Sequence, residues 1–305
     1  MAAHPGPVLV TGANSGIGLA SVLRLAARGW ETWGTVRSAE KARLLAERAR
    51  EAGLREGVRP LVVDVSDAEA VRAAWRRLPD FWAVVNNAGY TELGAVEEVS
   101  AAQARAQLDV NLVAPAVVSA CALPGMRRLG GGRIVMMSSI AGRASVLPLN
   151  AWYHASKFGL EALSDVLRVE VASFGVRVVL IEPGFFRTGI EAKAGDTLAR
   201  RKDRKGSLYG PAYARAERWL ALVERIAPSA EHVARVVASA VESRRPLRRY
   251  VVGLDALAAV ATQPFTPRAL TDLAMRVLGN LGGGGGPGAR TRRVERAGAR
   301  RPRPR

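Results

Sequence analysis

Tyr153 and Lys157 are the two residues of this chain whose types and spacing suggest chemistry most directly. They are four residues apart, so on a helix they share one face, one turn from each other. An ammonium group beside a phenol favours the phenolate and lowers the pKa of the tyrosine toward the range of a general acid or base. The same spacing also arises by chance on an amphipathic helix, so the upstream sequence must decide between these interpretations.

A glycine-rich turn follows a short apolar strand near the N-terminus. The strand is expected over 7–11, the segment TGANSGIG occupies 11–18, and a helical pattern continues to Gly29. This order is typical of a dinucleotide site, because glycines let the backbone approach phosphates at a helix N-terminus. The alternative is a glycine turn that binds no ligand. The candidate phosphate-binding residues are Gly12, Asn14, Ser15, Gly16, Ile17 and Gly18.

Arg37 ends a second expected strand, Glu31–Val36, where dinucleotide-binding folds read the adenosine ribose. A carboxylate at this place favours the 2′-hydroxyl, whereas an arginine can hold a 2′-phosphate. No acidic residue lies between Thr32 and Ala39. The position therefore favours NADP(H) over NAD(H), unless Arg37 is only a solvated charge that begins the next helix.

Further apolar runs alternate with helical patterns along the chain. Runs without period-two alternation indicate strands of a parallel sheet that is covered on both faces, and the alternation predicts an α/β, doubly wound parallel sheet. We expect one domain over residues 5–280. The expected strands are Leu61–Val65, Phe81–Val85, Arg133–Met137 and Arg177–Ile181, and the expected helices include 38–52, 67–78, 103–128 and 152–174.

Several motifs follow the glycine turn in a fixed order, and together they are specific. They are Asp64-Val65, Asn86-Asn87-Ala88-Gly89, Asn111, Ser139, Tyr153, Lys157 and Pro183-Gly184. In these motifs the chain resembles the short-chain dehydrogenase/reductase family over residues 5 to about 255, and its ending is similar to the steroid- and retinol-dehydrogenase-like members. The resemblance implies a Rossmann-type scaffold with a catalytic tetrad of Asn111, Ser139, Tyr153 and Lys157.

The resemblance also assigns cofactor contacts. It implies that Asp64 contacts the adenine, that Lys157 binds the nicotinamide ribose, and that Thr188 lies near the carboxamide. Asp64 is alternatively a helix N-terminal cap. Ser139 lies fourteen residues before Tyr153, one more than is common in the family, so Ser138 is the fallback for the serine. The other implied cofactor neighbours are Val65, Asn87, Ala88, Gly89, Tyr153, Pro183 and Gly184.

Composition limits the remaining classes of function. Apolar residues make up 49% of the 305 residues, enough for a buried core, and the single Cys121 excludes internal disulfides. The three histidines have no ligand spacing, so no metal site is expected. The N-terminus leaves no room for a secretory signal, and the uncharged apolar run 110–126 is too short to span a membrane. We therefore expect a cytoplasmic protein.

Positive charge is concentrated at the C-terminus. The chain carries a formal charge of +18, and residues 281–305 contain eight Arg and one Glu among many Gly and Pro. This composition predicts a disordered basic tail. The tail could contact nucleic acid or an anionic membrane, but a solvated end is the simpler interpretation, and no specific nucleic-acid partner is expected.

Residues 185–228 are interpreted as a helical substrate lid. Phe185, Phe186, Tyr209, Tyr213 and Trp219 offer an apolar wall, which Leu147, Leu149 and Trp152 are expected to face. The pattern favours a hydrophobic ketone or secondary alcohol of steroid, retinoid or lipid type. The alternatives are a 3-oxoacyl-thioester reductase and a non-catalytic NADP-binding regulator. The resemblance and two apolar helices, 103–128 and 152–174, favour a homodimer or homotetramer.

Overall fold

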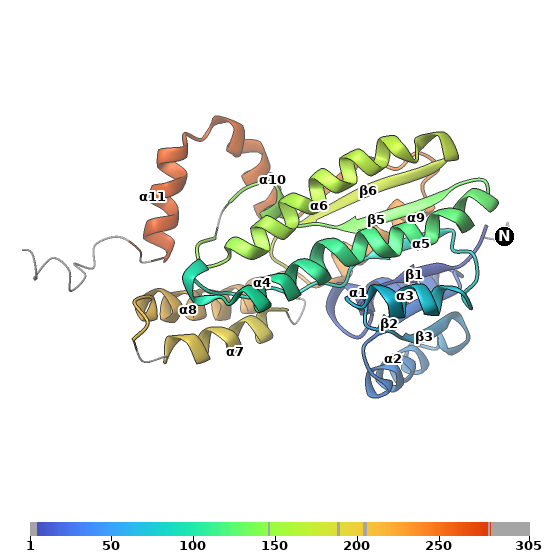
Figure 1. Cartoon of the computed structure of the whole chain (residues 1–305), viewed down its shortest axis with the longest axis horizontal. Helices are drawn as coiled ribbons and strands as arrows, with labels where there is room; N and C mark the ends of the chain where they lie inside the picture. Colours follow the sequence, from blue (N-terminus) through green and yellow to red (C-terminus); the bar gives the residue numbers. More distant parts are fainter. Residues whose placement is uncertain (1–4, 146, 188–189, 204–205, 280, 282–305) are drawn as a thin grey trace, which may run out of the picture.

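The computed structural model describes residues 5–145, 147–187, 190–203, 206–279 and 281. Within them, seven parallel strands form one sheet in the order β3-β2-β1-β4-β5-β6-β7 (Figure 1). The predicted doubly wound α/β, Rossmann-type fold is therefore confirmed. The strands are β1 Val8–Val10, β2 Thr32–Val36, β3 Val58–Val62, β4 Ala83–Asn86, β5 Gly132–Met137, β6 Val176–Pro183 and β7 Arg249–Val252.

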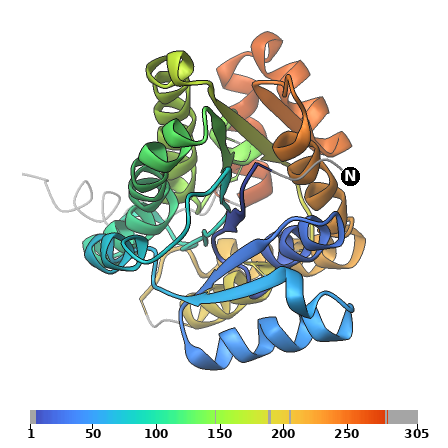
Figure 2. The same ribbon diagram turned by 90° about the vertical axis from the view of Figure 1, so that its right-hand side faces the viewer.

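Helices cover both faces of the sheet, which explains why the strands are apolar without alternation (Figure 2). Every residue of β1, β4 and β5 is buried. Residues of α1, α2 and α9 form the core on one face, and residues of α3, α5 and α6 form it on the other. These helices are α1 Gly16–Ala27, α2 Ala39–Glu51, α3 Ala68–Trp75, α5 Ala114–Arg128, α6 Ala151–Glu170 and α9 Glu231–Glu242.

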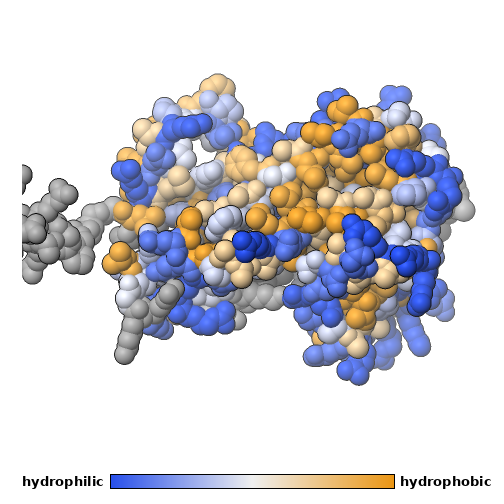
Figure 3. All heavy atoms as spheres, in the orientation of Figure 1, coloured by the Kyte–Doolittle hydropathy of each residue, from blue (hydrophilic) through white to orange (hydrophobic). Residues whose placement is uncertain are grey.

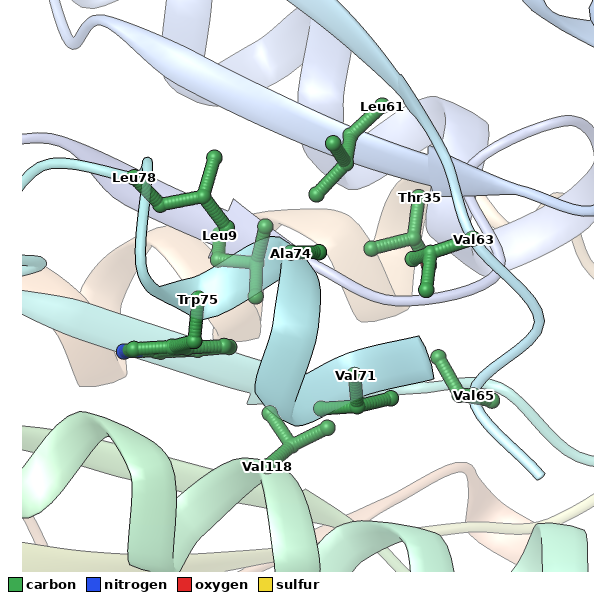
Figure 4. Close-up of a pocket in the computed structure, with 10 residues that line it drawn as sticks. All are labelled: Leu9, Thr35, Leu61, Val63, Val65, Val71, Ala74, Trp75, Leu78 and Val118. Carbon is green, nitrogen blue, oxygen red and sulfur yellow. The ribbon is translucent and has the colours of Figure 1, made fainter. Parts of the chain in front are cut away.

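The core beneath α3 is closely packed. A cavity of about 10 Å³ remains between α3 and the strands β1 to β3, and side chains such as Leu9, Val71 and Trp75 surround it (Figure 4). Its lining is almost entirely apolar, and it has at most the volume of one water molecule. This cavity is therefore a packing defect and not a ligand site.

Strand order reverses between β1 and β4, and this reversal positions the functional site. The chain leaves β1 through α1 toward β2 on one side, whereas β4 pairs with β1 on the other side through Val10 and Val85. The connections at the carboxyl ends of β1 and β4 therefore diverge and leave a crevice, which is where open α/β sheets bind ligands.

The helix expected over 103–128 is not one regular helix. The structure has α4 Ala101–Leu108, a π-helical turn η3 Asp109–Val113, and then α5. The N–H of Ala114 bonds the carbonyl of Asp109 five residues back, and Pro115 has no N–H with which to restore the α-helical pattern. Proline at this point explains why the regular helix restarts only at α5.

The same run is long and apolar enough to resemble a membrane span. Residues 101–128 reach a mean hydropathy of 1.5 in an 18-residue window, of which 39% is buried. Val118, Ala122 and Met126 pack into the core below the sheet. A long helix that packs in the core of a protein has the same apolar composition.

Strand β3 begins and ends three residues earlier than the expected Leu61–Val65. Pro60 lies within it, which an edge strand tolerates because one side of its backbone has no partner strand. Asp64 and Val65 therefore follow the strand instead of ending it. The other elements are η1 Arg55–Gly57, η2 Val96–Glu98, η4 Ile140–Gly142, η5 Ala172–Phe174, α7 Ile190–Lys202, α8 Gly210–Ile226, α10 Leu254–Thr262, η6 Gln263–Phe265 and α11 Arg268–Gly279.

The predicted division of the chain into a domain over 5–280, a lid over 185–228 and a basic tail stays a prediction. The lid segment does contain two helices, α7 and α8, and they pack against each other. Residues 282–305 of the tail lie outside the described residues.

Exposed apolar side chains on α6 and η5 bear on the expected homo-oligomer. Val166 and Val169 are 59% and 73% exposed, and Phe158 and Phe174 are also exposed. Hydrophobic residues gather over α6 in Figure 3. A contiguous apolar patch of this kind marks an interaction site.

We expect light scattering at micromolar concentration to give the mass of a dimer or tetramer, and Val169→Glu to lower that mass because it places a charge in the apolar contact. Leu44→Glu, on the exposed face of α2, is the matched control. A strict monomer for the wild-type chain would contradict the prediction.

Candidate active site

A cavity of about 570 Å³ lies at the carboxyl ends of the central strands, where the strand order places the crevice. The glycine turn and the segments after β2 and β3 line one end of it, and lid residues such as Trp219 and Leu220 line the other. Tyr153 and Lys157 lie on its wall. Most of the predicted site residues therefore share one cavity.

The glycine turn needs glycine at two of its positions. Gly12 has φ 68°, and a Cβ at Gly18 would lie 2.2 Å from the carbonyl oxygen of Gly12. A side chain at either place would force the turn apart. Helix α1 begins at Gly16, so its N-terminal N–H groups lie at this end of the cavity, and Asn14, Ser15 and Ile17 line the cavity with Gly12 and Gly18. This geometry fits the phosphates of a dinucleotide.

Thr11 joins the glycine turn to the segment after β4. Its Oγ1 accepts hydrogen bonds from the N–H groups of Asn87 and Ala88, both at 2.9 Å. The side chain of Asn87 donates in turn to the carbonyl oxygens of Thr11 and Gly12. Sequence reasoning missed Thr11, although it is the first residue of the TGANSGIG segment. These bonds hold two cofactor-facing loops at a fixed separation.

Arg37 and Asp64 lie together at the far end of the cavity, after β2 and β3. The Asp64 carboxylate accepts from the backbone N–H of Ser66 at 3.0 Å and from its hydroxyl at 2.7 Å, so it stabilises the turn before α3. The helix cap is Asp67, whose Oδ1 accepts from the N–H of Ala70. The alternative interpretation of Asp64 as the N-terminal cap is therefore wrong.

Tyr153 and Lys157 share one face of α6, as their spacing predicts. The Nζ of Lys157 lies 5.7 Å from the centroid of the Tyr153 ring. Lys157 is buried, and its Nζ donates to the carbonyl oxygen of Met137 at 2.8 Å. Burial lowers the pKa of Lys157 to about 8, while the charge of Glu161 acts in the opposite direction. A lysine with this pKa changes its charge close to neutral pH.

Ser139 follows β5 and faces the same cavity. Its Oγ accepts from the N–H of Ala141 at 3.1 Å, which fixes the turn η4. His154 on α6 holds this turn in place, with its Nδ1 at 2.8 Å from the carbonyl oxygen of Ala141. The fallback residue, Ser138, also lines the cavity, but it is buried and its hydroxyl lies beside Glu161. The geometry therefore favours Ser139 as the serine that reaches a substrate.

The loop before α6 carries an unusual residue where the sequence suggests an insertion. Leu149 has φ 61°, and it is the only described residue other than glycine with a positive φ. Such a conformation is uncommon for a bulky side chain. The loop therefore contains one strained backbone position, and Ser139 and Tyr153 at its two ends both line the cavity.

Comparison with known proteins decides the family. The sequence model described as short chain dehydrogenase matches residues 7–199, more than half of the chain. The chain belongs to the short-chain dehydrogenase/reductase family. It is therefore an oxidoreductase, as the sequence motifs predicted.

Individual relatives cover most of the chain. An NADPH-dependent 3-dehydrocapnine reductase of Ornithobacterium rhinotracheale is 31% identical, over 87% of this chain and 94% of the relative. The 17-beta-hydroxysteroid dehydrogenase type 1 of Homo sapiens is 33% identical, over 80% and 76%. A crystal structure of a short-chain dehydrogenase from Streptomyces avermitilis aligns with a TM-score of 0.71 and 28% identity, over 90% and 98%.

Asn111 lies in the π-helical turn of this short-chain dehydrogenase/reductase and is buried. Its Oδ1 accepts from the N–H of Tyr90 at 3.0 Å, and its Nδ2 donates to the carbonyl oxygen of Tyr90 and to Ser156. The side chain thus joins the loop after β4 to α6. It lies near Lys157, because a Cβ at Gly89 would be 3.3 Å from its Oδ1 and 3.7 Å from the Nζ of Lys157.

Pro115 gives a test of the turn at Asn111. Pro115→Ala would supply an N–H four residues after Asn111, and an α-helical bond to the Asn111 carbonyl would become available. We expect slower turnover with little loss of stability, because that carbonyl is where the family resemblance implies a proton-relay water. Steady-state rates across pH and thermal unfolding measure the two effects. An unchanged rate and pH profile would make the proline only a break in the helix.

A buried charge cluster beneath Lys157 was not predicted. Arg249 on β7 donates to Glu161, to Glu182 at 2.8 Å and to Asp165 at 2.7 Å. Glu182 is fully buried and Glu161 is 8% exposed. Burial raises the pKa of Glu161. Burial would lower the pKa of Arg249, but its bonds to Glu182 and Glu161 raise it overall. The only signal in the sequence was an acid in the apolar strand β6.

Only some of the residues predicted to form an apolar wall line the cavity. The rings of Phe185 and Trp219 meet edge to face at 4.9 Å and line the cavity. Tyr213 is instead buried in the lid, where its hydroxyl accepts from Ala95 and donates to Glu98 at 2.7 Å. Burial raises the pKa of Tyr213 to about 12.

Tyr209 and Leu149 also belong to the packing of the lid. Trp152 is not among the cavity-lining residues, whereas Phe186 and Leu147 are, as predicted. Pro183 and Gly184 line the cavity after β6, as do Val65 and Gly89 near their strands. Thr188 lies outside the described residues. No cluster of metal-ligating side chains occurs among the residues that the structure describes.

Proposed function

We propose that this chain transfers a hydride between NADP(H) and a hydrophobic ketone or secondary alcohol, with Tyr153 as the general acid or base. One observation carries the proposal. Tyr153, Ser139 and the buried Lys157 face a cavity whose one end is a glycine cradle and whose other end has the apolar side chains of Phe185, Trp219 and Leu220 together with Arg200. A carbonyl group at the apolar end would then lie between a cofactor and a proton donor.

Each member of the tetrad has a separate task in this proposal. The nicotinamide supplies or accepts the hydride when it is bound. In reduction, Tyr153 donates its phenolic proton to the carbonyl oxygen, and in oxidation it removes the proton of the alcohol. Ser139 donates a hydrogen bond to the same oxygen and stabilises its developing charge. Lys157 in its charged form lowers the pKa of the phenol.

Cofactor contacts in this proposal follow the cavity from end to end. The N–H groups at the start of α1 hold the phosphates, and Arg37 and Asp64 bind the adenosine end. Lys157 would hydrogen-bond the nicotinamide ribose. Thr188 is kept as a proposed neighbour of the carboxamide. The remaining proposed neighbours are Gly12, Asn14, Ser15, Gly16, Ile17, Gly18, Val65, Asn87, Ala88, Gly89, Tyr153, Pro183 and Gly184.

NADPH is the proposed cofactor because Arg37 lines the end of the cavity after β2. We expect Arg37→Asp to weaken NADPH binding by at least about tenfold, since a carboxylate repels the 2′-phosphate, and to favour NADH. Titrations of both cofactors by nucleotide fluorescence measure the change. Arg43→Asp, a charge reversal outside the cavity lining, is the control. Equal wild-type affinity for NADPH and NADH would contradict the assignment.

A hydrophobic substrate is proposed from the apolar end of the cavity, where Phe185, Trp219, Leu147 and Leu220 meet. The human relative named for hydroxysteroids supports the same class. A panel of steroid, retinoid and 3-oxoacyl-thioester substrates, followed by NADPH absorbance, tests it. Turnover confined to the thioester would favour the alternative reductase. We expect the reaction in the cytoplasm, where a free thiol such as Cys121 stays reduced.

A further inference from the structure

The helices after β7 are almost entirely exposed. Among residues 254–279 and 281, only Ala256 and Gly279 are buried. We call α10, η6 and α11 the C-terminal helices. They stand at one end of the molecule in Figure 1. Helix α11 contacts α8, and α10 contacts β7 and η4, but these contacts leave most side chains of both helices exposed. Helices of nine and twelve residues are marginal in water, so a further packed surface would stabilise them.

The exposed side chains of the C-terminal helices are largely apolar. On α11, Leu270, Leu273 and Val277 form one stripe, with Arg268 on the opposite side of the helix and Arg276 at the edge of the stripe. Phe265, at the turn between the two helices, is 86% exposed. An amphipathic helix with this division lies flat in a membrane interface. The full set of large exposed apolar residues is Leu254, Leu257, Phe265, Leu270, Leu273, Val277, Leu278 and Leu281.

Positive charge flanks these helices in the sequence. Arg244, Arg245 and Arg248 are exposed just before it in the sequence, and residues 282–305, which follow α11, contain eight Arg and one Glu. The C-terminal helices contain two acidic residues. Asp255 is turned toward the loop after β6, where it accepts from the N–H of Phe185, and Asp272 is exposed on α11. In a contact between two copies of this chain, the arginines of one copy would repel the same arginines of the other. An anionic bilayer attracts these arginines instead.

We propose that the C-terminal helices dock on an anionic lipid bilayer, with their apolar side chains in the interface and the arginines at the headgroups. The docked surface adjoins the cavity. A Cβ at Gly279 would lie 2.7 Å from Cγ of Pro148, which lines the cavity, and Asp255 bonds the Phe185 segment on its other side. An apolar substrate dissolved in the bilayer then has a short path to the cavity. This last consequence rests on the proposed function, but the docking does not.

Vesicle binding of the full chain, without substrate or cofactor, tests the docking. We expect co-sedimentation with vesicles of equal parts phosphatidylcholine and phosphatidylserine, little with phosphatidylcholine alone, and release at high salt. The double variant Phe265→Glu and Leu270→Glu should lower binding at least about tenfold, since two apolar anchors become charged. Replacing Arg290, Arg292 and Arg293 by Gln should lower it by a similar factor.

Controls separate docking from its alternatives. Leu44→Glu, an exposed leucine on α2, should bind vesicles like the wild type. Failure of the wild type to bind anionic vesicles, or equal losses in Leu44→Glu, would overturn the proposal. If the double variant instead lowers the mass found by light scattering, the surface is a contact between copies. A third outcome is that a DNA duplex competes with the vesicles and that the double variant binds vesicles as tightly as the wild type. Binding would then depend only on the arginine-rich residues 282–305, and the proposal would also fail.

Discussion

Tyr153→Phe is expected to lower kcat by about 10²- to 10⁴-fold, the range that a positioned general acid or base contributes. The substitution removes only the phenolic oxygen, so the ring keeps its place on α6 beside Lys157. Cofactor affinity should therefore change little. NADPH absorbance under saturating substrate gives kcat, and a fluorescence titration gives the affinity for NADPH in the same preparation.

The control for this substitution is Tyr250→Phe. The Tyr250 hydroxyl accepts from the N–H of Leu247 and is not among the cavity-lining groups, so its loss should leave kcat unchanged. Near-normal turnover of Tyr153→Phe would show that another group handles the proton. Loss of NADPH binding together with turnover would instead indicate a structural effect, and the assignment of the acid or base would then lack support.

The residues that could be predicted from the sequence are those whose geometry is local. The Tyr153–Lys157 pair needs only helical spacing, and the glycine turn needs only its place between a strand and a helix. Likewise, parallel strands bring their carboxyl ends to one edge, which explains why Ser139 after β5 and Asn87 after β4 lie at the same edge. These residues do line one cavity.

What could not be predicted depends on contacts between distant segments. Tyr213 looks like a cavity-lining aromatic in the sequence, but its hydroxyl finds partners at Ala95 and Glu98, more than a hundred residues away. Helix periodicity also gave no sign of the π-helical turn around Asn111, because a one-residue insertion hardly changes an apolar pattern. Long-range hydrogen bonds decide the position of Tyr213, whereas Pro115 breaks the regular helix after Asn111.

Arg249 is the clearest example of such a contact, and it gives the prediction with the largest expected effect on stability. It joins β7 to Glu161 on α6 and to Glu182 on β6. Arg249→Met would leave Glu182 with Arg143, whose Nη1 is 3.4 Å away, and Glu161 with the charge of Lys157. Removing one partner of a buried pair costs about 3–5 kcal/mol, so we expect a loss of that size in the free energy of unfolding.

The pH dependence of this loss distinguishes charge from packing. In Arg249→Met, the folded-state pKa of Glu161, already raised by burial, should rise further above its value in the unfolded chain, about 4.3. The folded state then binds more protons than the unfolded state between these two values, so the stability of the variant falls as pH rises through them. Urea unfolding near pH 5 and pH 8 should show the larger loss at the higher pH.

Two further variants test whether the charge and the forked geometry of Arg249 stabilise the fold. Arg249→Lys keeps the charge but not the forked geometry, so it should recover part of the stability. Arg248→Met removes a neighbouring exposed arginine and should cost little. Glu161 also favours the charged form of Lys157, so the alkaline limb of the turnover profile should shift to lower pH in Arg249→Met as Glu161 loses charge. A loss of stability that is equal at both pH values, with an unshifted profile, would mean that Arg249 only fills space between β7 and α6.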